Sequence, residues 1–347
     1  MRLRTVFGTA LCLALAGCYT LQAVRGQWEV LGARRSLAAV RADPATDPRT
    51  AQSLAIAAEA RDLTRAALGL RRSGSYSSFV RLPREWPVWN VIVAPEFAVE
   101  PRPQCFALIG CLAYRGFFAE ADAHAWAERA RARGDDVFVA PVPAYSTLGW
   151  FDDPVMWSML RWDDATLAGF VAHELAHEAL YTGDDTAFDE AFAETVAAAV
   201  VQRMFTTPER ADLLTRWRRS RQVQAQSDAL RLAARGELAV LYASTADVAT
   251  LRTGKRVRLE RLTQELSALA SGLGSQRWDN ARLALTATYA ELVPGFTGLL
   301  AEADGDLGRF RTRVAELAHQ PPEVRRAALA AAAQRAVARV AAERASG

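Results

Sequence analysis

The chain has 347 residues, of which 51% are hydrophobic and 23% are charged, and its formal net charge at neutral pH is +3. This near balance argues against nucleic acid as a partner, because nucleic-acid-binding domains usually carry a marked basic excess. The length and the hydrophobic content are enough for one large core or two smaller ones.

The first residues have the pattern of a secretion signal that ends in a cysteine. A short basic end precedes an apolar run over residues 6–16, which is too short to span a bilayer as a stable helix. The sequence LAGC at residues 15–18 resembles the lipobox of bacterial lipoproteins, in which cleavage before the cysteine leaves it as the lipid-bearing first residue. We therefore expect residues 1–17 to be removed as a signal peptide and Cys18 to anchor the chain to a membrane.

The residue after the cysteine bears on which membrane that is. Tyr19 stands where an aspartate would hold such lipoproteins at the inner membrane, so the resemblance favours the outer membrane, with the chain facing the periplasm. Removal of residues 1–17 takes away Arg2 and Arg4 and no acidic residue, so the net charge falls from +3 to +1.

The predicted elements form an α+β arrangement that is mostly helical. Residues 21–70 have a helical pattern, with a break at the two Asp-Pro pairs of residues 43–44 and 47–48. Short β-rich runs and one helix follow, and from residue 163 almost everything is helical, with breaks at residues 272–274 and 321–322. The β-rich runs cover residues 89–95, 105–117 and 137–142, and the helix between the second and third covers residues 119–134. We expect a small sheet in residues 86–147 and a surface helix after Pro322.

Two cysteines remain in this β-rich region once the signal is removed. Cys105 and Cys111 flank a hydrophobic turn and are separated by five residues. In an oxidising compartment such a pair is expected to form a local disulfide.

The stretch HELAH at residues 173–177 contains two of the four histidines in the chain. On a helix, His173 and His177 lie about 40° apart on one face, so both imidazoles can bind one metal ion. Zn²⁺ held by three protein ligands keeps a position for water, and a neighbouring carboxylate can then accept the water's proton. Glu174 is the candidate for that base.

The third ligand depends on where the chain turns back. Residues 181–186 read as a turn, with Gly183 as the expected helix end and Asp185 or Thr186 as the cap of the next helix. If the two helices pair antiparallel about this turn, Glu190 lies level with His177 and Glu194 level with His173. Either carboxylate can then reach the metal.

The sequence DEAFAE at residues 189–194 resembles the second motif of the gluzincins, in which Asn-Glu is followed by any two residues and then by Ser or Ala. This resemblance implies that Glu190 is the third zinc ligand and that Glu194 steadies the first histidine from behind, as an aspartate does in the thermolysin branch. Asp189 replaces the usual asparagine, and only twelve residues separate His177 from Glu190, fewer than in thermolysin-like enzymes.

The chain as a whole resembles a family of bacterial lipoproteins described as predicted aminopeptidases. The similarity lies in the lipobox, the HELAH block and four further stretches, WNV at 89–91, CFALIGCLAYRG at 105–116, AYSTLGWFDDP at 144–154 and NARL at 280–283. It implies a zincin-like core over residues 86–205, with a helical segment over 18–85 before it and a helical region over 206–347 completing the cleft.

The resemblance implies a lipid-anchored zinc peptidase of the cell envelope, an aminopeptidase, acting on peptides or proteins. Two alternatives stay open: an envelope endopeptidase, and a non-catalytic lipoprotein with a structural zinc site. The run over residues 143–150 is a candidate sheet edge for an extended substrate, or else an aromatic loop packed over the core. Three tyrosines, Tyr114, Tyr145 and Tyr289, are candidates for stabilising the oxyanion. Asn280 and Arg282 either line the cleft or bridge helices.

Overall fold

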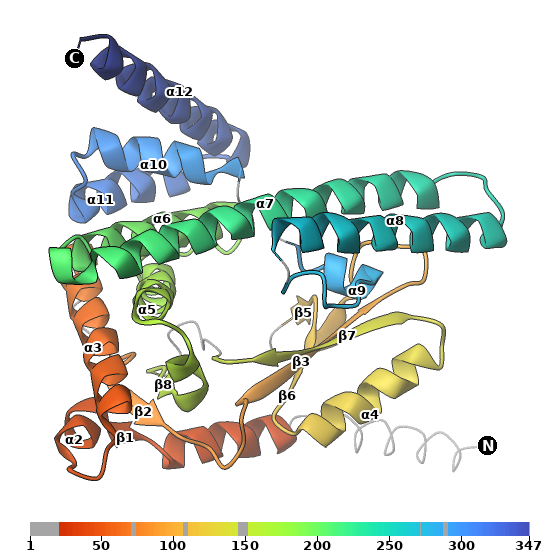
Figure 1. Cartoon of the computed structure of the whole chain (residues 1–347), viewed down its shortest axis with the longest axis horizontal. Coiled ribbons are helices and arrows are strands. Elements are labelled where there is room, and N and C mark those ends of the chain that lie inside the picture. Colours follow the sequence, from red (N-terminus) through yellow and green to blue (C-terminus); the bar gives the residue numbers. More distant parts are fainter. Residues whose placement is uncertain are drawn as a thin grey trace, which may run out of the picture.

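The computed structural model describes residues 21–70, 74–106, 110–144, 152–270, 272–286 and 291–346. Helices dominate the described chain and the sheets have two or three short strands each, so the predicted mostly helical α+β class is confirmed (Figure 1). Cys18, Tyr145 and Tyr289 lie outside the described residues.

The N-terminal region contains three helical segments. Residues 21–32 are helical and are followed by α2 (Leu37–Ala42) and α3 (Pro48–Leu68). The predicted break between the last two is confirmed, because Asp47 caps α3 by accepting a 3.0 Å hydrogen bond from the backbone of Thr50, and the ring of Pro48 suits the first helical position. The interruption before α2 was not predicted. There the strand β1 (Arg35–Ser36) leaves the helical path to pair with β2.

The described strands form three small sheets. In the first, β2 (Ser78–Val80) lies between β1 and β8 (Val155–Met156), and it runs parallel to β8. The second places β3 (Val88–Ala94) between β6 (Arg115–Phe117) and β7 (Asp136–Val142), both antiparallel to it, and the third is the hairpin of β4 (Gln104–Phe106) and β5 (Gly110–Leu112). The predicted β-rich runs therefore form β3 to β7. The β2–β8 pairing was missed, since it joins two very short segments 75 residues apart.

Two further predictions in this region are confirmed. Cys105 and Cys111 face each other across the β4–β5 hairpin and form a disulfide. The expected helix is α4 (Glu120–Arg131), whose Ala123 and Ala127 pack against Val91 of the central strand.

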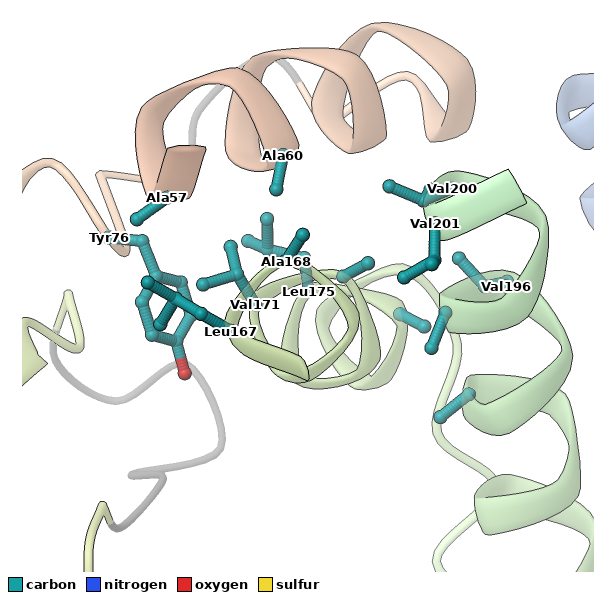
Figure 2. Close-up of a cluster of buried hydrophobic side chains, with 14 of the residues drawn as sticks. Ala57, Ala60, Tyr76, Leu167, Ala168, Val171, Leu175, Val196, Val200 and Val201 are labelled. Carbon is teal, nitrogen blue, oxygen red and sulfur yellow. The ribbon is translucent and has the colours of Figure 1, made fainter. Parts of the chain in front are cut away.

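The largest core surrounds α5 (Asp164–Ala179), the helix that bears the HELAH sequence. Leu167, Val171 and Leu175 of α5 are fully buried. Figure 2 shows α5 almost end-on between α3 and α6 (Thr186–Met204), with the small side chains of Ala57 and Ala60 allowing α3 to approach closely. Helix α6 crosses α5 steeply in this view, so the two helices do not lie in the antiparallel arrangement that was considered for placing Glu190 and Glu194.

The C-terminal half consists of helices. A short 3-10 turn, η2 (Pro208–Arg210), leads into α7 (Ala211–Tyr242), which forms a long hairpin with α8 (Val248–Leu269) (Figure 1). The remaining helices are α9 (Asn280–Leu283), α10 (Val293–Glu302), α11 (Leu307–Ala318) and α12 (Pro322–Ser346).

Helix α12 lies at the surface as predicted, since most of its described residues are exposed, but one side of it is buried. It packs along α10, and Leu329 and Ala332 are buried in the same core cluster that surrounds α5. This cluster also includes Leu54 of the N-terminal region, so it draws on all three predicted segments of the mature chain. Among the described helices, none combines the length and the apolar character needed to cross a bilayer.

Candidate metal centre

The two histidines are presented by the C-terminal half of α5. Asp163 begins this helix by accepting a 2.9 Å hydrogen bond from the backbone of Thr166, and the buried aliphatic face fixes the rotation of the helix about its axis. His173 and His177 therefore point to the side on which α6 lies, with 19% and 9% of their side chains exposed. Both rings are held in place by burial on a rigid element.

The turn between α5 and α6 differs from the prediction at one end and agrees at the other. Helix α5 ends at Ala179, with Leu180 already extended, and not at Gly183, whose φ of 74° belongs to the turn that follows. Asp185 caps α6, as one of the two predicted alternatives, by accepting a 3.1 Å hydrogen bond from the backbone of Phe188.

Asp189 closes this turn and explains the departure from the gluzincin asparagine. Its carboxylate accepts hydrogen bonds from the backbone of Thr182 at 2.9 Å, from the Thr182 hydroxyl at 3.0 Å and from the backbone of Gly183 at 3.4 Å. Burial nevertheless raises the pKa of Asp189, and the hydrogen bonds oppose this only in part. An aspartate, which accepts hydrogen bonds at both carboxylate oxygens, suits this short connection better than an asparagine. The bonds of Asp189 also fix the position of Glu190, the next residue of α6.

The ligand atoms of His173, His177 and Glu190 converge on one point. The Nε2 atoms of the two histidines are 3.2 Å apart, and the Glu190 carboxylate lies 3.3 Å from Nε2 of His173 and 3.6 Å from Nε2 of His177. Among the described residues, these three form the group of His, Cys, Asp and Glu side chains that could hold a metal ion.

These separations fit zinc. Ligand atoms about 2.0–2.2 Å from one ion, at tetrahedral angles, lie roughly 3.3–3.6 Å from one another. The two Nε2 atoms are 3.2 Å apart, and each has one oxygen of Glu190 at a similar distance, Oε2 at 3.3 Å from His173 and Oε1 at 3.6 Å from His177. Two imidazole nitrogens and one carboxylate oxygen also form a usual donor set for catalytic zinc, which leaves one position open.

Glu194 lies on the far side of His173. Its carboxylate is 3.9 Å from Nδ1 of His173, the nitrogen that does not face Glu190, and it also pairs with the guanidinium of Arg221 on α7. A carboxylate behind a ligating imidazole orients the ring and fixes its tautomer. Nδ1 of His177 is buried and has no hydrogen-bond partner among the described residues.

The charges at the centre favour metal-binding protonation states. Burial, together with the positive charge of His173, lowers the pKa of His177 to about 4. Burial alone would also lower the pKa of His173, but the carboxylates of Glu190, Glu174 and Glu194 outweigh it and raise that pKa. Burial disfavours ionised Glu190, yet its hydrogen bond with His173 and the charges of both rings hold its pKa below the usual value. At neutral pH the His177 imidazole is thus neutral and the Glu190 carboxylate ionised, as metal ligation requires, whereas the raised pKa of His173 favours a proton that a metal ion would have to displace.

Glu174 lines a cavity of about 390 Å³ that His173, one of the three candidate ligands, also lines. The cavity lies between α5, α6 and α7, and His173, Phe170 and Arg221 are also in its wall. A base for water therefore lies in the same space that a substrate would enter.

Other charged and polar residues lie away from this cavity. Glu96 and Glu100 pair with Arg252 and Arg235 and do not line it, whereas Asp228 is in its wall. Asn280 bridges elements, since its side chain donates to the backbone of Glu96 at 2.9 Å.

Sequence reasoning missed Tyr76, which lies in the turn before β2. It is 2% exposed, and Figure 2 shows it against Leu167 and Val171 of α5. Burial and the negative charge of Glu174 both raise the pKa of its phenol well above the usual value, so the ring lies near the predicted base. Its φ of 57° is unusual for a tyrosine, yet no sequence pattern links residue 76 to residue 174.

Comparison with known proteins places the chain in a family. A family model described as "Putative aminopeptidase" matches residues 18–329. No curated protein and no solved structure matches the chain.

Proposed function

The chain belongs to the family described as "Putative aminopeptidase", and on that premise we propose that it is a zinc-dependent aminopeptidase, held at the cell envelope by lipid on Cys18. The observation that supports zinc is the triangle formed by His173, His177 and Glu190, whose ligand atoms lie within 4.8 Å of one another and include two imidazole nitrogens and a carboxylate oxygen, a usual donor set for zinc. Glu174, in the wall of the adjoining cavity, is the proposed base.

The proposed roles follow from position and charge. A zinc ion at the triangle would supply Lewis acidity toward water and toward the peptide carbonyl. Glu174 accepts the proton of the attacking water and returns it to the leaving amine, as a general base and then a general acid. Glu194 holds His173 by its Nδ1 atom and is itself held by Arg221.

The cavity favours a catalytic site over a structural one. Structural zinc sites are closed by four protein ligands, whereas here the described residues offer three, one of which, His173, lines a space of about 390 Å³, and the Glu190 side chain is 28% exposed. An endopeptidase would use the same centre, so the exopeptidase part of the proposal rests on the family description.

The lipid anchor and the location rest on the sequence of the signal. Cleavage before Cys18 would leave the described residues tethered by a few residues, with a peptide or protein substrate reached from the periplasmic side. Outer-membrane retention is proposed because Tyr19 follows the cysteine. Radiolabelled palmitate incorporation into the wild type, and its loss in Cys18→Ala, tests this part separately.

Metal analysis and peptide digestion test the enzymatic part together. We expect one zinc per chain in purified protein that lacks residues 1–18, hydrolysis of a peptide library from the amino end, and loss of hydrolysis with a chelator. Glu174→Gln is expected to retain stoichiometric zinc while its turnover falls by about 10²–10⁴-fold. A Glu174→Gln protein that still cleaves at the wild-type rate contradicts the assignment, and internal cleavage would favour the endopeptidase alternative.

A further inference from the structure

One face of α7 runs from the metal centre to a second cavity. Trp217, Arg221, Gln224, Asp228 and Arg231 follow one another at helical spacing, and all but the last line the cavity beside Glu174. Gln224 and Asp228 also line a second cavity of about 270 Å³, together with Arg231. The two cavities are therefore neighbours along one helix, and α7 contacts both α5 and α9 (Figure 1).

The second cavity gathers hydrogen-bond donors around one indole ring. The guanidinium groups of Arg231 and Arg282 lie 4.9 and 5.1 Å from the centre of the Trp278 ring, and Arg282 also stacks 4.3 Å from the centre of the Phe138 ring. Nε1 of Trp278 is buried and has no hydrogen-bond partner within the described residues. The cavity thus brings two guanidinium groups close to an indole N–H that lacks an acceptor.

The positive charge of this cavity is only partly neutralised. Asp228 pairs with Arg231 at 2.9 Å and is held by Gln224. For Arg282, the described residues offer no carboxylate within ion-pairing distance, and its guanidinium donates to the backbone of Arg277 at 3.3 Å. Burial lowers the pKa of Arg282, the charge of Asp279 opposes this in part, and the charge of Arg231 lowers the pKa further. An anion paired with Arg282 would oppose the effects of burial and of Arg231.

We propose that the Arg231–Arg282 cavity binds the carboxylate of a peptide whose amino end lies at the metal centre. The inference rests on the proposed function, because it takes the metal cavity as the place of cleavage. Guanidinium groups bind carboxylates by paired, charge-assisted hydrogen bonds.

The distance between the two cavities sets the length of the peptide. Arg221 and Arg231 are ten residues apart on α7, which corresponds to about 15 Å along the helix axis. An extended peptide covers that distance in roughly four or five residues. The preferred substrates are therefore free-acid oligopeptides of about four to six residues.

Hydrolysis of an alanine series tests length and carboxylate together. Peptides of three to eight residues are prepared with free and with amidated carboxyl ends, and kcat and KM are measured with zinc-loaded protein. We expect the lowest KM for the free acids of four to six residues, and a KM about tenfold higher for the matching amides, since one charge-assisted contact is equivalent to about that factor.

Substitutions then locate the effect. Arg282→Gln is expected to raise the KM of the free pentapeptide about tenfold while leaving the amide unchanged, and Arg282→Lys is expected to restore part of the difference. Arg256→Gln, on the exposed surface of α8 where Arg256 pairs with Glu260 at 3.1 Å, is the matched control and is expected to behave as wild type. Equal KM values for acid and amide in the wild type, or an equal rise for both in Arg282→Gln, would overturn the inference.

Two further experiments distinguish the carboxylate site from the proposed peptidase function. An amidated pentapeptide ending in glutamate, compared with one ending in glutamine, shows whether a side-chain carboxylate is accepted in place of the terminal one. Calorimetric binding of the free and amidated pentapeptides to the Glu174→Gln protein needs no turnover. If the wild type does not hydrolyse the peptides but the Glu174→Gln protein binds the acid in preference to the amide, the proposed function is contradicted and the carboxylate site is retained. If the wild type hydrolyses the peptides with no preference for the acid, the proposed function is retained and the carboxylate site is contradicted.

Discussion

At the scale of single residues, the centre shows why one ligand could not be chosen from spacing alone. Glu190 and Glu194 are one helical turn apart, so both face α5 and both stand close to a histidine. The structure separates their roles by the imidazole nitrogen that each one faces. Glu190 lies between the two Nε2 atoms, whereas Glu194 lies by Nδ1 of His173 and against Arg221.

Neutral amide variants at the two positions are expected to differ in zinc affinity. Glu190→Gln replaces an anionic ligand at the triangle, so we expect the zinc Kd to rise by more than 100-fold. Glu194→Gln alters only a partner of His173, for which losses of about 10–100-fold are usual. Competition titration with a fluorescent chelator measures both constants, and the reverse order would assign the third ligand to Glu194.

Some features of the centre follow from local sequence and others do not. The helical spacing of His173 and His177 is a property of any α-helix, and the cap at Asp185 is a strong local signal. The approach of Tyr76 and Arg221 depends on how α5 packs with the N-terminal region and with α7, which is decided by the core as a whole. Local patterns therefore pointed to the two histidines, left Glu190 and Glu194 open as the third candidate ligand, and missed the surroundings of all of them.

At the scale of elements, the sequence predicted helices better than their contacts. The β-rich runs became strands β3 to β7 because alternating apolar residues and flanking prolines and glycines are local signals. The strand pair β2–β8 and the close packing of α12 on α10 depend on segments that are distant in sequence. Glycines of α10 allow α12 to approach closely, and no sequence pattern reveals this approach.

The contact of α10 with α12 is expected to be sensitive to one methyl group. A Cβ on Gly298 would meet the backbone oxygen of Ala332 at 2.5 Å, so the helices would have to separate. We expect Gly298→Ala to lower the free energy of unfolding by about 1–3 kcal/mol, as overpacking does. Gly236→Ala in α7, where a Cβ would meet nothing within 4 Å, is the control and is expected to add up to about 1 kcal/mol. Urea denaturation measures both, and equal effects would contradict this packing.

Helix α12 also holds the turn between the two ligand helices. The guanidinium of Arg325, only 6% exposed, donates to Asp184 at 2.8 Å and to the backbone of Ala318 at 2.6 Å. The hydrogen bond with Arg325 lowers the pKa of Asp184 below its ordinary value of 3.8. A carboxyl group with a depressed pKa stabilises the fold above its unfolded pKa, and this contribution is lost as the pH falls through the folded value.

Removal of this ion pair is expected to matter at neutral pH and not in acid. Asp184→Asn should have a lower melting temperature than the wild type at pH 7, and the difference should shrink as the pH falls below about 4. Thermal unfolding between pH 7 and pH 3 measures the difference, with Asp304→Asn, at an exposed ion pair away from the turn, as the control. A difference that stays constant over this range would show that the charge of Asp184 does not stabilise the turn.

At the scale of the whole molecule, the metal centre depends on segments far from it in sequence. Phe188 and Phe192 project from α6 into the main core, where the Phe188 ring lies 4.9 Å from that of Phe296 and the Phe192 ring stacks 5.6 Å from that of Phe310. Leu54 of α3 belongs to the same cluster. The rigidity of α5 and α6 is thus supplied in part by α3, α10 and α11.

This arrangement predicts that residues 86–205, which contain every proposed ligand, do not fold as a separate unit. Alone they would expose the faces of α5 and α6 that α3, α10 and α11 cover, and burial of one Leu or Phe side chain is equivalent to about 1.5–3 kcal/mol. Since a domain is stable by only about 5–15 kcal/mol, loss of several such contacts should abolish cooperative unfolding. Circular dichroism and zinc titration measure this. The fragment is expected to show no thermal transition and no zinc site with wild-type affinity, whereas residues 21–346 are expected to show both. A fragment that folds and binds zinc normally would show that α5 and α6 need neither the N-terminal nor the C-terminal helices.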